Sequence, residues 1–261
     1  MSTVSNISST TRARVSYEQN GRSEEEREYQ HWFERSRLVI SPTASPSAMG
    51  LFAFASATLI VAGHLAGWYG KATTLFYWAP FFVAFGGIGQ FLAGMWSYKA
   101  RDTIATVAHT MWGSFWVGFG LLWLLIGAKV LPAPAGLATT HVVGLGMWFV
   151  MLAILTMFCA FASLGKNLGR FVTLGLLAAG SALLAAGYIG GYHTTIVAGG
   201  WVLVASVGAA IWTGAALMFS DTFGRVILPL MEWNKRSNIP GRVIARPIEY
   251  RGGMPGSRVG Q

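Results

Sequence analysis

Six long apolar stretches constrain the fold of this chain more than any other feature of its sequence. Each is close to the ~20 residues that an α-helix needs to cross the hydrocarbon core of a bilayer. Each is also apolar around its whole circumference, as burial in lipid or in a bundle requires, and none alternates with a period of two. The sequence therefore predicts an all-α membrane protein whose six transmembrane helices lie at about 48–68, 75–96, 105–127, 139–162, 171–190 and 196–219.

Charge is scarce and unevenly placed in the sequence. Charged residues make up 11% of the 261 residues, against about 25% in a soluble domain. Asp102 is the only carboxylate between Leu38 and Phe219. The formal net charge of +9 comes from membrane-flanking positions and the C-terminal tail, because Arg and Glu balance in the N-terminal arm. We therefore expect membrane lipids as partners and no nucleic acid.

Three regions follow from this distribution. We expect a cytoplasmic N-terminal arm at 1–40, a transmembrane transport domain at 41–230 and a flexible basic tail at 231–261. In the arm, Ser23 and Glu26 form a capping-box pattern, which predicts a short amphipathic helix. That helix lies on the membrane surface or on a neighbouring subunit, or it is simply solvated.

Lys and Arg indicate the orientation of the six helices. The loops after the second and fourth apolar stretches are the richer ones, with Lys99, Arg101, Lys166 and Arg170, and both termini are rich in Arg. Because cytoplasmic loops carry an excess of Lys and Arg, we expect a multi-pass protein of the cell membrane with both termini in the cytoplasm.

The first apolar stretch begins with Ser45-Pro46-Ser47. Ser is a preferred N-cap and Pro is suited to the first helical position. The next backbone N–H groups then lack intrahelical partners and form a partly positive helix end, which suits a carboxylate. The alternative is an ordinary membrane helix that begins with Ser-Pro at the interface.

A few polar side chains lie inside the apolar stretches. Gln90 and Thr110 could line a pore or bond to neighbouring helices, and His109 could be a pH-sensitive residue of a lumen. The sequence has no catalytic constellation, no metal-ligand spacing and a single cysteine, Cys159. We therefore expect no enzyme activity, cofactor or metal.

Four motifs in order resemble the acetate uptake transporter family, the YaaH-like acetate/succinate transporters. SPSAMGL at 45–51 stands in the place of that family's Asn-Pro-Ala-Pro-Leu-Gly-Leu, and GGIGQFLAGMWSYKARDT, HTMWGSFW and FGRVILP follow at the expected spacing. Together they cover about 41–230. The family's Asn, Glu and Tyr are replaced here by Ser45, Ser97 and Trp112.

The resemblance implies a six-helix subunit that encloses its own narrow pore and assembles as a homo-oligomer, a hexamer. The implied constriction is a ring of Phe54, Trp112 and a leucine, either Leu176 or Leu177. The implied function is a channel or transporter for acetate or a similar small monocarboxylate. Two alternatives stay open: the same pore with a different small solute, which Trp112 favours, and a non-transporting membrane sensor or scaffold, which the long terminal arms favour.

Overall fold

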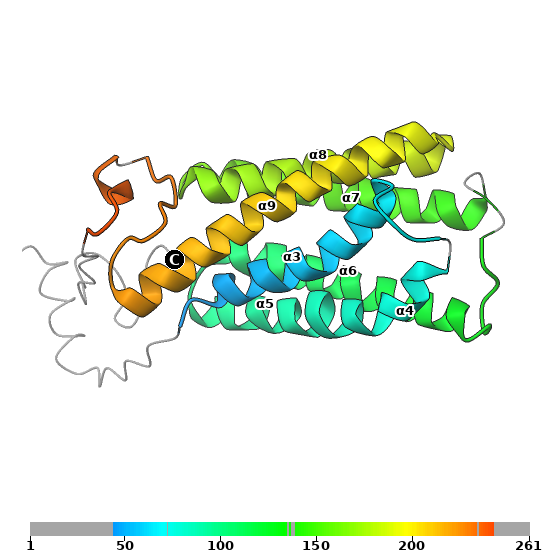
Figure 1. Cartoon of the computed structure of the whole chain (residues 1–261), viewed down its shortest axis with the longest axis horizontal. Helices are drawn as coiled ribbons and strands as arrows, with labels where there is room; N and C mark the ends of the chain where they lie inside the picture. The colour runs from blue at the N-terminus through cyan, green and yellow to red at the C-terminus, as the bar shows by residue number, and fades with distance from the viewer. Residues whose placement is uncertain (1–43, 72, 135, 137–138, 234, 243–261) are drawn as a thin grey trace, which may run out of the picture. The chain divides into compact units, whose positions relative to one another are not determined.

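The computed structural model describes residues 44–71, 73–134, 136, 139–233 and 235–242. Over these residues the chain forms a bundle of long helices (Figure 1). The elements in chain order are α3 (Pro46–Leu65), α4 (Thr74–Phe81), η1 (Phe82–Gly89), α5 (Gln90–Lys99), α6 (Thr103–Gly127), α7 (Thr140–Ser163), α8 (Leu168–Gly190), α9 (His193–Phe223) and η2 (Lys235–Asn238). The predicted arm at 1–40 and most of the predicted tail lie outside the described residues.

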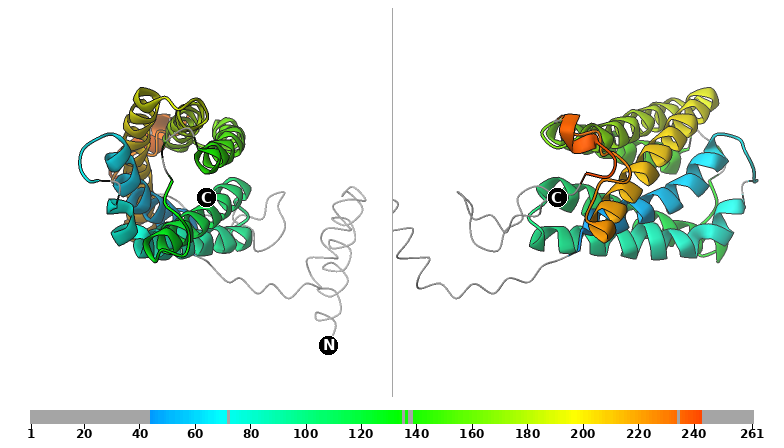
Figure 2. Two further views of the ribbon diagram at one scale, coloured as in Figure 1. Left: turned by 90° about the vertical axis from the view of Figure 1, so that its right-hand side faces the viewer. Right: turned by 60° about the vertical axis from the view of Figure 1, so that its left-hand side comes forward.

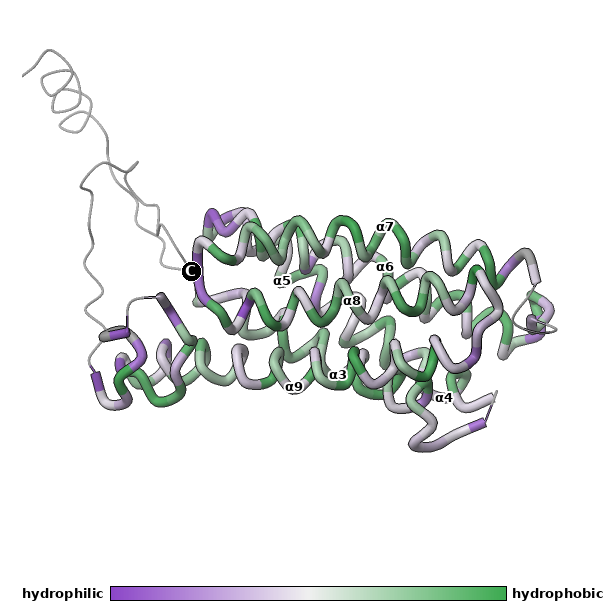
Figure 3. Tube along the Cα trace, turned by 90° about the horizontal axis from the view of Figure 1, so that it is seen from above, coloured by the Kyte–Doolittle hydropathy of each residue, from purple (hydrophilic) through white to green (hydrophobic). Residues whose placement is uncertain are grey.

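Within the described part of the chain, six helical segments are long and apolar enough to cross a membrane, and they match the six apolar stretches of the sequence. One of them, Thr74–Lys99, combines α4, η1 and α5. The apolar residues run along the length of the helices, with the more polar residues toward the ends of the bundle (Figure 3). The prediction of an all-α protein with six membrane-spanning helices is confirmed.

The six segments surround a common interior. α9 packs on both α3 and α8, α8 packs on α7, and α6 packs on α5 and η1, which in turn pack on α3. Contact between α6 and α7 is light. An end-on view shows the helices arranged around the bundle axis (Figure 2, left). Buried side chains from α3, α6, α7, α8 and α9 meet in one apolar cluster inside this arrangement.

The second membrane segment is irregular at its centre. Pro80 lies inside α4, and the eight residues Phe82–Gly89 that follow form a π-helix. Pro has no backbone N–H to donate, and η1 is rich in glycine, so the ordinary α-helical hydrogen bonding is weakened here. The π-helix turns Gly86 toward α3 and α6, where a Cβ atom would lie 2.6 Å from the Cβ of Ala57.

Close helix contacts depend on glycine at two further positions. A Cβ atom on Gly94 of α5 would lie 2.7 Å from the backbone nitrogen of Thr110 on α6, and one on Gly200 of α9 would lie 2.6 Å from that of Ala66. Small residues let the backbones of membrane helices approach closely. Such close packing is important because little hydrophobic force brings helices together within lipid.

The chain turns back on the bundle after α9. Leu168 and Gly169 at the start of α8 donate backbone hydrogen bonds to the carbonyls of Met231 and Leu230. Further on, Val226 bonds to Arg242, and Asn238 bonds to the backbone of Glu232. The first residues of the predicted tail therefore make specific hydrogen bonds, whereas 243–261 lie outside the described residues.

Candidate functional site

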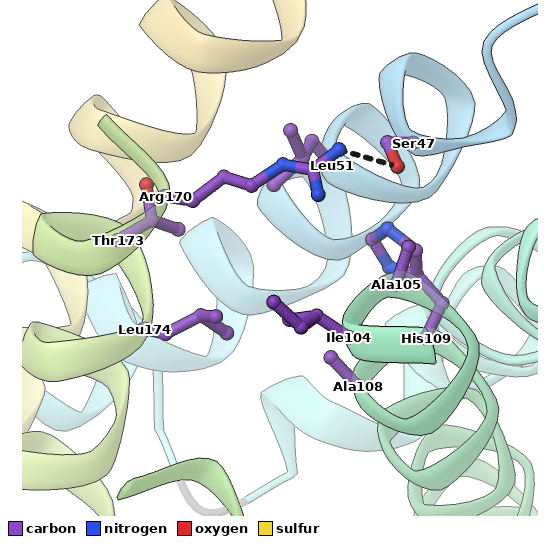
Figure 4. Close-up of a pocket in the computed structure, with 9 residues that line it drawn as sticks. All are labelled: Ser47, Leu51, Ile104, Ala105, Ala108, His109, Arg170, Thr173 and Leu174. Carbon is purple, nitrogen blue, oxygen red and sulfur yellow. Dashed lines mark hydrogen bonds between the residues drawn. The ribbon is translucent and has the colours of Figure 1, made fainter. Parts of the chain in front are cut away.

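A pocket opens between α3, α6 and α8, near the end of the bundle where α3 begins. Its lining mixes a few polar groups with a mostly apolar wall: Ser47, Leu51, Ile104, Ala105, Ala108, His109, Arg170, Thr173 and Leu174 (Figure 4). Small-molecule sites commonly have this composition, with apolar surface around a small number of placed polar groups.

Arg170 is the charged residue of this pocket. It is only 6% exposed, although it was expected in a loop, because α8 begins at Leu168 and carries Arg170 inside its first turn. Its Nη1 donates to Oδ2 of Asp102 at 2.6 Å, and its Nη2 donates to Oγ of Ser47 at 3.1 Å. The guanidinium therefore joins three elements, α8, the N-cap of α6 and the first turn of α3.

Asp102 is fixed in place by a second role. It is the N-cap of α6, and its Oδ1 accepts a hydrogen bond from the backbone N–H of Ala105 at 3.2 Å. An N-cap carboxylate stabilises a helix start by accepting an otherwise unpaired N–H and by opposing the positive end of the helix dipole. Arg170 thus meets an anion that is held by α6.

His109 lies on the α6 side of the same pocket. It is 6% exposed, and its Nδ1 has no hydrogen-bond partner among the described residues. The space for its ring exists because residue 50 is glycine: a Cβ there would lie 2.5 Å from Cε1 of His109. His109 and Ser47, both predicted from the sequence as pore-lining residues, are therefore brought together in one pocket.

The start of α3 differs in part from the expected free helix end. Ser45 is the N-cap and Pro46 is the first helical residue, but the Ser45 side chain makes no capping bond. The backbone N–H of Ser45 donates to Oδ2 of Asp221 at 3.3 Å. The Ser45 side chain is buried, Pro46 is half-buried, and neither residue lines the pocket.

Deeper in the bundle, aromatic and aliphatic side chains fill the interior. Phe54 and Trp112 are buried and meet edge to face, with ring centroids 6.3 Å apart. Leu177 belongs to the same buried cluster, whereas Leu176 is only half-buried and is not part of it. Of the two leucines that the sequence allowed for the ring, Leu177 is thus the one that accompanies Phe54 and Trp112.

Trp112 is also hydrogen-bonded to the neighbouring helix α7. Its indole Nε1 donates to Oγ1 of Thr156 on α7 at 2.9 Å, and its ring contacts Phe115. Buried Trp N–H groups usually find such a partner. This hydrogen bond fixes the ring orientation at the position where the resembling family has Tyr.

The remaining two predicted residues lie elsewhere. Gln90 is 2% exposed and begins α5, and its Oε1 is unpaired among the described residues. Thr110 is half-buried and faces Gly94 of α5. Neither residue lines the pocket. Within the described part of the chain, no three His, Cys, Asp or Glu side chains are grouped so that they could hold a metal ion.

Sequence reasoning missed the pair of Arg170 and Asp102, although one signal pointed to it. Asp102 is the only carboxylate between Leu38 and Phe219. A lone carboxylate at the edge of a membrane helix is costly unless a cation accompanies it, so a buried Lys or Arg partner could have been sought.

Comparison with known proteins agrees with this architecture. Residues 35–233 match the GPR1/FUN34/yaaH family. The succinate-acetate/proton symporter SatP of Escherichia coli K12 is 31% identical over 190 residues, which cover 72% of this chain and 96% of that protein. The acetate transporter protein patA of Aspergillus clavatus is 32% identical over 160 residues, covering 57% of this chain and 60% of that protein.

A solved structure has the same fold. The structure of the bacterial acetate channel SatP superposes with a TM-score of 0.64 at 27% identity, over 72% of this chain and 99% of that one. The order of the four sequence motifs, the six membrane-spanning helices and these matches agree with one another. The chain belongs to the GPR1/FUN34/yaaH family.

Proposed function

We propose that this protein is a membrane channel or transporter that passes acetate or a similarly small monocarboxylate through each subunit. The observation that carries the proposal is the succession of two features along the bundle interior. A pocket with a guanidinium, a hydroxyl and an imidazole lies at one end, and the apolar cluster of Phe54, Trp112 and Leu177 lies beyond it.

This arrangement suits a solute with one charged end and a small apolar end. The polar groups of the pocket match a carboxylate, and the apolar side chains restrict passage to a solute that is small and sheds much of its water. The relatives named for acetate support the same substrate class.

Flux of labelled acetate into liposomes that contain the purified protein tests the proposal. We expect uptake that saturates with acetate and exceeds that of protein-free liposomes. Folded protein that gives no excess uptake would refute the proposal and would favour a sensor or scaffold role.

The second candidate function is transport of a different small solute through the same pore. It is favoured because the Trp112 ring, held by its hydrogen bond to Thr156, fills space at the proposed constriction. Substitution Trp112→Tyr tests it, and we expect the variant to admit larger monocarboxylates. An unchanged competition profile against acetate would show that Trp112 does not set selectivity.

We also propose that the subunits assemble as a hexamer. Large apolar side chains are exposed along α4, η1 and α5 and along α7, including Phe85, Trp96, Trp148 and Phe158. These surfaces suit lipid or a neighbouring subunit. Native mass spectrometry of the purified protein would give the subunit number, and a monomer or dimer would contradict the hexamer.

A further inference from the structure

The pocket holds an ion pair whose geometry leaves part of the cation unused. Arg170 presents five N–H donors in a planar fork. One donates to Asp102 and one to Ser47, and the other three have no partner among the described residues. A guanidinium with free donors at a pocket wall is suited to bind a carboxylate, which accepts two parallel hydrogen bonds from it.

A second unpaired group lies in the same pocket. Nδ1 of His109 is buried and has no hydrogen-bond partner among the described residues. Buried polar groups are ordinarily paired, so a ligand is a natural partner for one that lines a pocket. Figure 4 shows the guanidinium of Arg170 pointing toward Ser47, with the ring of His109 on the α6 side of the same pocket.

The rest of the lining matches the other end of a short acid. Leu51, Ile104 and Leu174 contribute side chains to the pocket, together with two alanines, and Arg170 and His109 are the titratable residues that line it. A methyl or short alkyl group can therefore rest on an apolar wall while its carboxylate meets the polar groups.

The buried ion pair of Arg170 and Asp102 is not explained by a gain in protein stability. Removing two charges from water costs several kcal/mol for each ion, and replacing such a pair by apolar residues is often neutral or stabilising. Recognition of an anion in the pocket would explain why the chain keeps this charge pair there.

Resting on the proposed function, we propose that this pocket is a carboxylate-binding site of the transport path, in which Arg170 binds the carboxylate and Asp102 positions Arg170. Because Asp102 is held by the N-cap of α6, it keeps the guanidinium at the pocket wall when no substrate is present. It also offsets the charge of Arg170, so that a bound anion is released again, as passage through a channel requires.

The test uses the full chain with both charges removed, Arg170→Leu with Asp102→Asn, because this double variant leaves no unpaired buried charge. The control is Lys99→Met, which removes an exposed cation at the end of α5, the same end of the bundle as Asp102, without touching the pocket. The melting temperature of each purified protein is measured in sodium acetate, in sodium chloride of equal concentration, and in acetamide, the uncharged analogue of acetate.

A ligand that binds only the folded state raises the melting temperature. We expect sodium acetate, relative to chloride, to raise the Tm of the wild-type protein and of Lys99→Met by a few degrees. We expect acetamide to have no such effect. The double variant should melt normally in chloride and lose the acetate-dependent rise, and its half-saturation for acetate flux should increase at least about tenfold.

Two outcomes would refute the proposal that this pocket binds a carboxylate. One is a wild-type Tm that does not respond to acetate, and the other is a double variant that keeps the full acetate-dependent rise. If the wild-type liposomes still take up acetate in either case, only the site is refuted and the proposed function stands.

Discussion

We propose that individual side chains in the bundle interior set the size of the passage for the solute. Phe54 comes from α3 and meets Trp112 of α6 edge to face within the buried cluster. Removing its ring leaves a cavity that a solute can use, because protein interiors are closely packed and relax only in part.

Substitution Phe54→Ala is therefore expected to loosen size selection and to admit acids longer than acetate. The measurement is liposome uptake of acetate, butyrate and hexanoate. The matched control is Phe158→Ala on α7, which removes a ring that is exposed on the outside of the bundle. Continued exclusion of hexanoate by Phe54→Ala would show that Phe54 does not line the narrowest point of the passage.

Asp102 is expected to limit the strength of anion binding at Arg170. Substitution Asp102→Asn keeps a side-chain oxygen that can cap α6 but removes the charge that offsets the guanidinium. We expect a lower half-saturation for acetate together with a lower maximal flux, because a more tightly bound anion leaves more slowly. Concentration-dependent uptake measures both quantities, and a raised half-saturation would contradict the role given to Asp102.

The helices were largely predictable from the sequence, and their mutual contacts were only partly so. Composition alone locates six apolar stretches, since lipid permits few alternatives to a helix. Phe54 and Trp112 were placed by motif position, and both lie in the buried cluster.

What the sequence could not supply is the pairing of residues across elements. Arg170 and Asp102 are 68 positions apart, and they meet because α6 and α8 both begin at the same pocket. Which of Leu176 and Leu177 joins the buried cluster depends on the rotation of α8 about its axis, which local sequence preference does not fix.

At the level of helix packing, Gly94 determines how closely α5 approaches α6. A Cβ atom there would lie 2.7 Å from the backbone nitrogen of Thr110, which cannot move aside as a flexible side chain can. We expect Gly94→Val to destabilise the protein by about 1–3 kcal/mol through overpacking. Thermal unfolding in detergent measures the loss, with Gly118→Val as control because a Cβ at Gly118 has no neighbour within 4 Å. Equal melting temperatures of the two variants would contradict this account.

At the level of the whole molecule, the orientation in the membrane can be tested with single cysteines. The chain has one cysteine, Cys159, which is buried on α7. In a Cys159→Ser background, Lys99→Cys and Lys129→Cys place one thiol at the end of α5 and one after α6, at opposite ends of the bundle. We propose that Lys99 lies on the cytoplasmic side.

A membrane-impermeant maleimide added to whole cells is then expected to label position 129 and not position 99. Labelling of both positions after the membrane is opened confirms that each thiol is reactive. The reverse pattern on whole cells would place both termini outside the cell and would contradict the orientation expected from Lys and Arg.

The light packing of α6 against α7 has a mechanical consequence. The other neighbouring helices pack more extensively on one another, whereas the contacts between α6 and α7 include the hydrogen bond from the Trp112 indole to Thr156 and the ring contact of Phe115 with Phe149. A helix bundle is expected to widen first between the two helices with the fewest contacts, because separating them loses the least packing energy. Trp112, which we propose narrows the passage, would thus also help to hold α6 and α7 together.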